Sequence, residues 1–157
     1  MLATVLAITG TLLGATVTGL FQHAAAGRTE KTTRREQHRR DQLEAVTALA
    51  VAISDHRAAM WGRGDARLKG DPEDRVRELQ THSHATRSAV TRPRIALRLL
   101  ITDPSVRQAA DAMVTATYAM RDAYTSTSDL TTARAAAMTA HDHFVDIVAR
   151  YLEGNPR

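Results

Sequence analysis

The sequence predicts an all-α protein: an N-terminal transmembrane helix that continues into a long helix and an antiparallel four-helix bundle. Residues 1–22 carry no charged side chain, and six basic residues follow within residues 28–40. The rest of the chain contains four stretches in which apolar residues recur every three or four positions, separated by short connections. This spacing is typical of helices that bury one face.

The first predicted element is a membrane helix in residues 1–24. Residues 2–22 are rich in Leu, Val, Ala and Thr, and at ~1.5 Å per residue they can cross a ~30 Å hydrocarbon layer. Because the basic residues follow this segment and none precedes it, the N-terminus is expected outside the cell membrane and the bundle in the cytoplasm. A cleaved signal peptide, leaving a secreted soluble bundle, is the alternative, since Ala24-Ala25-Ala26 offers a cleavage site.

Small residues form one face of this segment: Ala7, Gly10, Gly14 and Thr18. Such a face lets two helix backbones approach closely in lipid. It predicts a homo-oligomer that forms through the membrane helices. The alternative explanation is that Gly and Ala are simply common in membrane helices.

Residues 25–42 are predicted to form a basic juxtamembrane helical stalk, because no aliphatic seam begins before residue 43. Its cations are Arg28, Lys31, Arg34, Arg35, Arg39 and Arg40. Each basic residue near anionic headgroups contributes ~1 kcal/mol, so we interpret them as contacts with the bilayer surface. They could also neutralise nucleic-acid phosphates. Membrane contact is favoured, because no interleaved aromatic residue or helix-turn-helix pattern accompanies them.

Residues 43–154 are expected to form the cytoplasmic bundle. The seam of its first helix consists of Leu43, Val46, Ala50, Ile53, Arg57 and Met60. Gly62, Gly64 and Gly70 then predict a loop over residues 62–70. Asp71 is expected to cap the second helix, with Pro72 in its first turn.

The second helix is expected to bury Val76, Leu79, Ser83, Thr86 and Val90. Pro93 should kink or end it, because proline lacks the backbone N–H of the helical ladder. The alternation in residues 94–101 also permits a strand. A lone strand would have no partner, so we interpret this run as a buried helical continuation.

Two further helices complete the predicted bundle. Asp103-Pro104 starts the third, whose seam is Val106, Ala110, Met113, Thr117, Met120 and Tyr124. A Ser/Thr turn at residues 125–128 leads to Asp129, the expected cap of the last helix. That helix carries Leu130, Ala137, His141, Phe144, Val148 and Tyr151 and ends at Gly154-Asn155-Pro156. Four amphipathic helices with short connections predict an antiparallel bundle.

No sequence motif predicts an enzyme, a cofactor or a metal site. The chain has no cysteine, and the seven histidines include two pairs spaced two apart, which places their rings on different sides of a helix. We interpret these histidines as solvated, and His141 as a hydrogen-bonded interior residue. No phosphate loop, nucleophile elbow or zinc motif is present.

Two stretches carry a resemblance to a known family. The first is Thr9-Gly10-Thr11-Leu12-Leu13-Gly14, then Phe21-Gln22 and the polar helix to Gln42-Leu43, and the second is the block from Arg98 to Val106. The chain resembles small actinobacterial membrane proteins of the KilB-like type, named after a plasmid-spread protein of mycelial conjugative plasmids. The resemblance implies a role in conjugative plasmid spread and no catalytic residues. With the membrane segment, it predicts a self-associating accessory or scaffold protein whose partners are the lipid bilayer, copies of itself and a further membrane protein.

Overall fold

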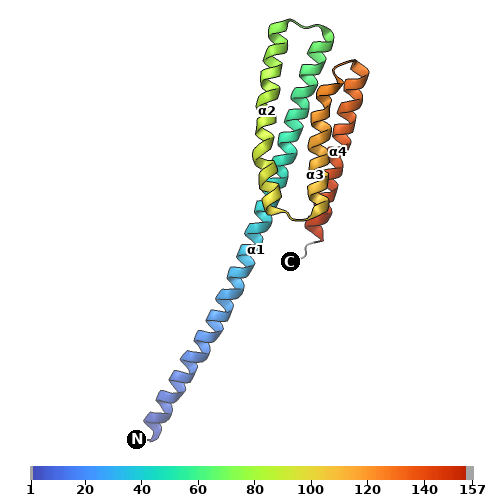
Figure 1. Cartoon of the computed structure of the whole chain (residues 1–157). Helices are drawn as coiled ribbons and strands as arrows, with labels where there is room; N and C mark the ends of the chain where they lie inside the picture. The colour runs from blue at the N-terminus through green and yellow to red at the C-terminus, as the bar shows by residue number, and fades with distance from the viewer. Residues whose placement is uncertain (1, 155–157) are drawn as a thin grey trace. The chain divides into compact units, whose positions relative to one another are not determined.

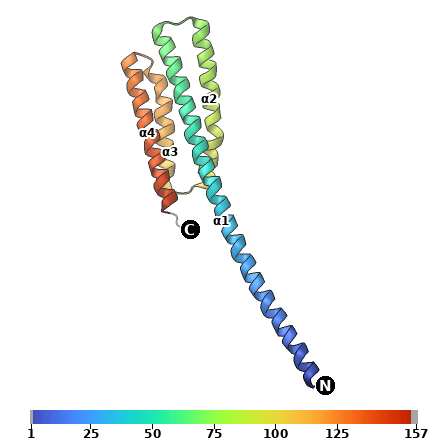
Figure 2. The same cartoon turned by 180° about the vertical axis from the view of Figure 1, so that it is seen from behind.

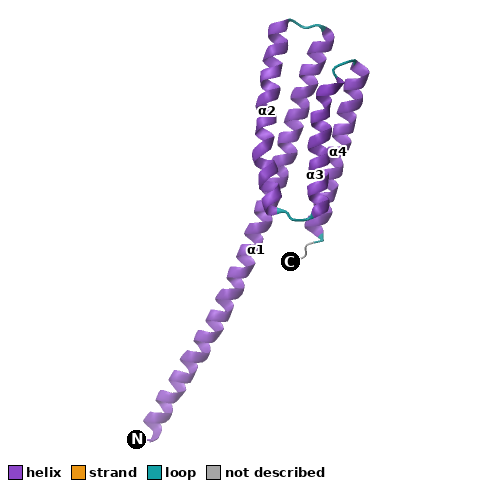
Figure 3. Cartoon of the chain, in the orientation of Figure 1, coloured by secondary structure: helices purple, strands orange, loops and turns teal. Residues whose placement is uncertain are grey.

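The computed structural model describes the backbone of residues 2–154 and the side chains of residues 33–154. Every regular element in this range is helical, as the predicted all-α class requires (Figure 3). The elements are α1 (Leu2–Lys69), α2 (Glu73–Leu100), α3 (Pro104–Ala119), the 3-10 helix η1 (Met120–Ala123) and α4 (Thr127–Glu153). The chain divides into two units, Met1–Arg40 and Asp41–Arg157. The expected division at residues 24 and 42 stays a prediction.

The second unit is a bundle in which the end of α1 lies beside α2, α3 and α4 (Figures 1 and 2). Each connection reverses the direction of the chain, and all four helices contribute to one set of buried apolar side chains. We call this set the aliphatic core; its members include Val46, Leu49, Ile53, Val90, Leu97, Val106, Met113, Phe144 and Val148. The interior is filled by apolar faces that the sequence spacing had placed on helices.

Where the predicted seam begins, the buried face of α1 differs from the prediction by one residue. Leu43 is 53% exposed, so its assignment to the seam is wrong. Gln42 is buried instead, and its Nε2 donates to the carbonyl of Leu100 at 2.9 Å and to the Tyr151 hydroxyl at 3.2 Å. A glutamine can occupy this position because both acceptors lie within reach.

The predicted loop over residues 62–70 is also wrong, because α1 continues to Lys69. Gly64 is buried, and a Cβ there would lie 2.6 Å from Cε1 of Tyr124 and 2.8 Å from Cδ2 of Leu130. This glycine therefore allows α1 to pack closely against the start of α4. Tertiary packing outweighs the helix-breaking tendency of the residue.

The helix ends at Gly70, which has φ +72°. The N–H of Gly70 donates to the carbonyl of Arg67, and the N–H of Asp71 donates to the carbonyl of Ala66. This pair of bonds is the Schellman arrangement, which favours glycine at the left-handed position. Asp71 is thus engaged in ending α1, and its predicted role as a cap of α2 is wrong: Pro72 holds the N-cap position without a side-chain bond.

The helical continuation after Pro93 is confirmed, because α2 extends to Leu100 with the proline inside it. The expected end at Pro93 is not observed. Only part of the continuation is buried: Leu97 is 1% exposed, whereas Ile95 and Leu99 are 54% and 77% exposed. A helix turns these two side chains away from the face that carries Leu97.

The start of α3 is confirmed and the start of α4 is corrected. Asp103 accepts hydrogen bonds from the N–H groups of Ser105 and Val106, as expected of a cap. At α4 the cap is Ser126, whose Oγ accepts from the N–H of Asp129 at 3.0 Å. Asp129 lies three residues inside and accepts from the Ser126 hydroxyl at 2.7 Å. The Ser126 hydroxyl thus accepts from the backbone of Asp129 and donates to its carboxylate.

Candidate functional site

Some of the site residues predicted from the sequence precede residue 33, where the described side chains begin. This applies to the membrane-packing residues Ala7, Gly10, Gly14 and Thr18, and to Arg28 and Lys31 of the stalk. The other stalk cations, Arg34, Arg35, Arg39 and Arg40, are all exposed. They belong to the unit Met1–Arg40, and their role stays a prediction.

Within residues 33–154, whose side chains the structure describes, no helix has the length and apolar character of a membrane span. The segment predicted to cross the bilayer, residues 1–24, lies outside those residues. Its membrane insertion therefore stays a prediction.

The most distinctive polar group in the bundle is His56 of α1, which is 2% exposed. Its Nδ1 lies 3.0 Å from Oγ1 of Thr86 on α2, and the Thr86 hydroxyl itself donates to the carbonyl of Ser83. Because that hydroxyl has a single proton, Nδ1 of His56 is the donor in the first contact. The ring also meets Tyr118 of α3 edge to face, with centroids 5.3 Å apart.

These surroundings keep His56 neutral at ordinary pH. Burial, and then the positive charge of Arg87, lowers the pKa of His56 from 6.5 to about 4. A neutral imidazole fits the contact with Thr86, whereas an imidazolium would be desolvated and repelled. The interpretation of the histidines as solvated is therefore wrong for His56. The spacing of Leu49, Ile53 and His56 on α1 was the one signal that could have predicted its burial.

Two arginines close to His56 lie over tyrosine rings. The guanidinium carbon of Arg87 is 4.5 Å from the ring centroid of Tyr118, and that of Arg63 is 5.8 Å from the centroid of Tyr124. Both distances are within the range of cation–π contact. Tyr124 donates its hydroxyl proton to the carbonyl of Met60 at 2.9 Å, and burial raises the pKa of this tyrosine.

A cavity of about 260 Å³ opens among these side chains. We call it the arginine cavity. α1 contributes His56, Met60 and Arg63, α2 contributes Ser83, His84 and Arg87, and α3 and η1 contribute Tyr118 and Arg121. The lining is basic and includes no carboxylate, so the cavity suits an anion better than a metal ion.

Among the residues whose side chains are described, the other histidines do not join a metal-binding cluster. No group of three or more His, Cys, Asp or Glu side chains with the geometry to hold a metal occurs in that part of the chain. His141, expected in the interior, is half-buried, and its Nδ1 lies 3.5 Å from Oδ1 of Asp142.

Comparison with known proteins identifies the family. A family model described as the KilB plasmid transfer protein matches residues 43–152, which include every residue that lines the arginine cavity. Protein KilB of Streptomyces lividans is 43% identical over 150 residues, which cover 96% of this chain and 97% of that protein. No solved structure matches the chain. The chain therefore belongs to the KilB plasmid transfer protein family.

Proposed function

We propose that this chain is a non-enzymatic, single-pass membrane protein that acts as a self-associating accessory component of a plasmid-transfer assembly. Membership in the KilB family is the observation that carries the proposal. The uncharged residues 1–22 and the cations that follow support anchoring with the N-terminus outside and the bundle in the cytoplasm.

A plasmid-spread assay tests the role. Disruption of the coding sequence is expected to reduce the spread of a transferring plasmid through a recipient culture, and the full chain supplied in trans should restore it. A chain without residues 2–22 should not restore spread, because the bundle would lack its anchor. Normal spread after disruption would refute the role in transfer.

Membrane fractionation tests the anchor separately. The full chain is expected to resist carbonate extraction, and protease added outside intact cells should leave the bundle uncut. N-terminal sequencing distinguishes the alternative of a cleaved signal. A mature chain that begins near Gly27, or release into the medium, would establish a secreted bundle and contradict the anchor.

Crosslinking in native membranes tests self-association. Leucine at Gly10 and Gly14 would keep the backbones of two helices apart, so the double substitution is expected to abolish the crosslinked dimer. Thr16→Leu is the matched control, because helical spacing places residue 16 on the opposite side of the segment. Crosslinking that survives the double substitution would exclude this face as the contact.

Nucleic-acid binding by the stalk is the second candidate, and the exposure of Arg34, Arg35, Arg39 and Arg40 favours it. A gel shift at low salt that weakens steeply as salt rises is expected of phosphate contacts. Glutamine at these four positions should remove the shift. Absence of a shift at low salt, together with binding to anionic vesicles, would leave membrane contact as their role.

A further inference from the structure

The arginine cavity has the size and charge of a site for a small anion. Its volume of about 260 Å³ lies just below that of pockets for drug-sized ligands, which span ~300–1,000 Å³. Arg63, Arg87 and Arg121 line it together with two histidines, and no lining residue is acidic. Three guanidinium groups around one space repel one another, and a bound anion would offset that repulsion.

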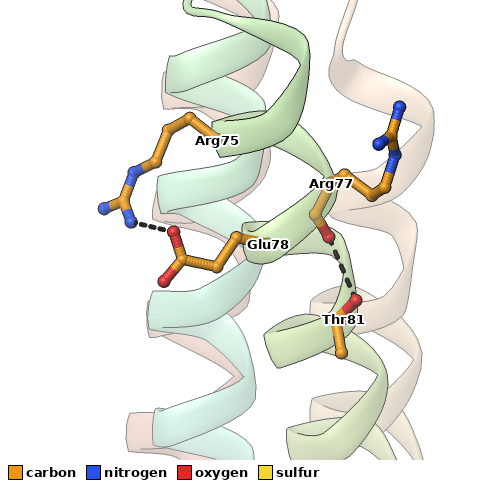
Figure 4. A network of polar contacts seen from close by, with 4 residues as sticks. All are labelled: Arg75, Arg77, Glu78 and Thr81. Carbon is orange, nitrogen blue, oxygen red and sulfur yellow. Dashed lines mark hydrogen bonds and ion pairs between the residues drawn. The ribbon is translucent and has the colours of Figure 1, made fainter.

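Arginines at the start of α2 have a different environment. Arg75 pairs with Glu78 at 2.6 Å (Figure 4), and Arg77 pairs with Glu73 at 2.9 Å. Among the described side chains, no ion pair joins Arg63 or Arg87 to a carboxylate. Arg75 and Arg77 are thus neutralised by local partners, and Arg121 of the cavity lies 3.4 Å from Asp122, whereas Arg63 and Arg87 have no such carboxylate in the described part of the chain.

Arg63 also has an unused hydrogen-bond donor. Its Nε is buried and has no acceptor among the described residues. A buried donor without an acceptor costs ~1–3 kcal/mol, and more when the group is charged. Because the Nε is closed to solvent, a ligand oxygen in the cavity would reach it only after a rotation of the guanidinium; Nη1 of Arg57 and Nε of Arg94, outside the cavity, also lack an acceptor within residues 33–154.

The cavity is preorganised on one side and accessible on the other. Arg87 is held over Tyr118, whose ring also contacts the buried His56. Arg87 and Arg121 are exposed, so a ligand can enter from solvent without opening the aliphatic core. Holding a guanidinium in place before binding reduces the entropic cost of binding.

The geometry points to a binding site in the arginine cavity for a small phosphate-bearing anion. Guanidinium groups match phosphate oxygens with paired hydrogen bonds, and a phosphate dianion offers more charge and more oxygen atoms to three arginines than a carboxylate does. The site involves no chemical step and does not depend on the membrane role.

Arginine side-chain NMR of the full-length protein in a non-ionic detergent tests the site. Inorganic phosphate is the probe, with acetate at matched ionic strength as the comparison. We expect the Nε–H signal of Arg63 to shift with phosphate at a Kd of about 1 mM or tighter, and to shift far less with acetate. An equal response to acetate, or none to phosphate, would overturn the proposal.

Matched substitutions locate the binding. Arg63→Gln and Arg87→Gln are each expected to weaken phosphate binding about tenfold. Arg77→Gln, which removes a neutralised arginine, should leave binding unchanged. Because Arg87 is exposed, its variant keeps the test valid even if Arg63→Gln fails to fold. Equal weakening by Arg77→Gln would indicate diffuse surface attraction and refute a site.

Phospholipids in mixed micelles with the same detergent distinguish the two sources of such an anion. Phosphatidic acid that displaces inorganic phosphate from Arg63, where phosphatidylcholine does not, would assign the site to a lipid headgroup. Displacement by neither lipid would assign it to a soluble phosphate compound.

Discussion

The aliphatic core and the arginine cavity use the same face of α1 with opposite chemistry. In the core, α1 contributes Leu49 and Ile53, both 0% exposed. Further along the same face it contributes His56 and then Arg63, opposite polar side chains of α2. Because burial of apolar surface stabilises and burial of unpaired polar groups destabilises, the core maintains the fold and the cavity weakens it. The arginine cavity thus lowers the stability of the bundle and leaves space that a bound anion could occupy.

The largest expected effect is at Phe144, which is 0% exposed in the aliphatic core. Phe144→Ala is expected to lower the free energy of unfolding by about 3–5 kcal/mol, through lost burial and the remaining cavity. Met60→Ala is the matched change beside the arginine cavity and should cost about 2 kcal/mol, because Met60 is also buried, against Met120 and Leu130, but fewer apolar atoms are removed. Urea unfolding measures both. A larger loss for Met60→Ala would contradict the comparison.

The next effect is the response of His56 to pH. The folded pKa of about 4 lies below the usual 6.5, so the unfolded chain binds this proton more readily. Stability is therefore complete above about pH 6.5 and falls as the pH drops toward 4, by at most ~3 kcal/mol. Arg87 is the cation that opposes protonation of the ring, and Arg63 and Arg121 are the other cations that line the same cavity.

His56→Gln separates this effect from the titration of carboxylates. Glutamine can still donate to Thr86 but cannot ionise, so the variant should lose less stability between pH 6.5 and 4 than the unmodified protein. Thermal unfolding across this range measures the difference. His143→Gln, at an exposed position of α4, is the matched control for the loss of one histidine. Identical curves for His56→Gln and the unmodified protein would contradict the lowered pKa.

A smaller effect is expected at Gly64, beside the cavity. The ring that a Cβ would meet is held by the bond from the Tyr124 hydroxyl to the carbonyl of Met60. Gly64→Ala should therefore destabilise by about 1–2 kcal/mol, despite the better helix propensity of alanine. Gly62→Ala should stabilise by about 0.5–1 kcal/mol, since the nearest atom to its Cβ is Cδ2 of Leu79 at 4.0 Å. Two changes of the same sign would contradict this packing.

Much of the fold could be predicted from local spacing, because helical faces are a local property. Ile53, Val90, Met113 and Phe144 were all assigned to seams and are all buried. The continuity of α1 through Gly64 could not be predicted, because it depends on Tyr124, which is distant in the sequence. The same holds for the exposure of Leu43, where Gln42 is buried through its bonds to two other helices.

The candidate site was harder to predict than the fold. Its arginines come from α1, α2 and η1, and none forms a local cluster with the others. The local cluster that the sequence does show, Arg34 to Arg40, lies outside the bundle unit. The spacing of His56 and Arg63 with Leu49 and Ile53 on one face of α1 was the available signal, and the interpretation of the histidines as solvated missed it.

The smallest expected effect concerns the cap of α4. A substitution there tests whether neighbouring hydroxyl groups alone stabilise the Asp129 carboxylate. Hydrogen bonds from Ser126 and Thr125 lower the pKa of Asp129. Ser126→Ala removes the first of these bonds, so the pKa of Asp129 should rise toward its usual value, while Thr125 keeps part of the shift. Because the pKa of Asp129 is lower in the folded chain, this contribution to stability is present above the unfolded pKa and is lost as the pH falls through the folded pKa.

Carboxyl NMR titration measures the change in the pKa of Asp129. An unchanged pKa of Asp129 in Ser126→Ala would mean that the helix terminus, and not the hydroxyl, stabilises the carboxylate. The pKa of His56, in contrast, is lowered by burial and by Arg87 of another helix.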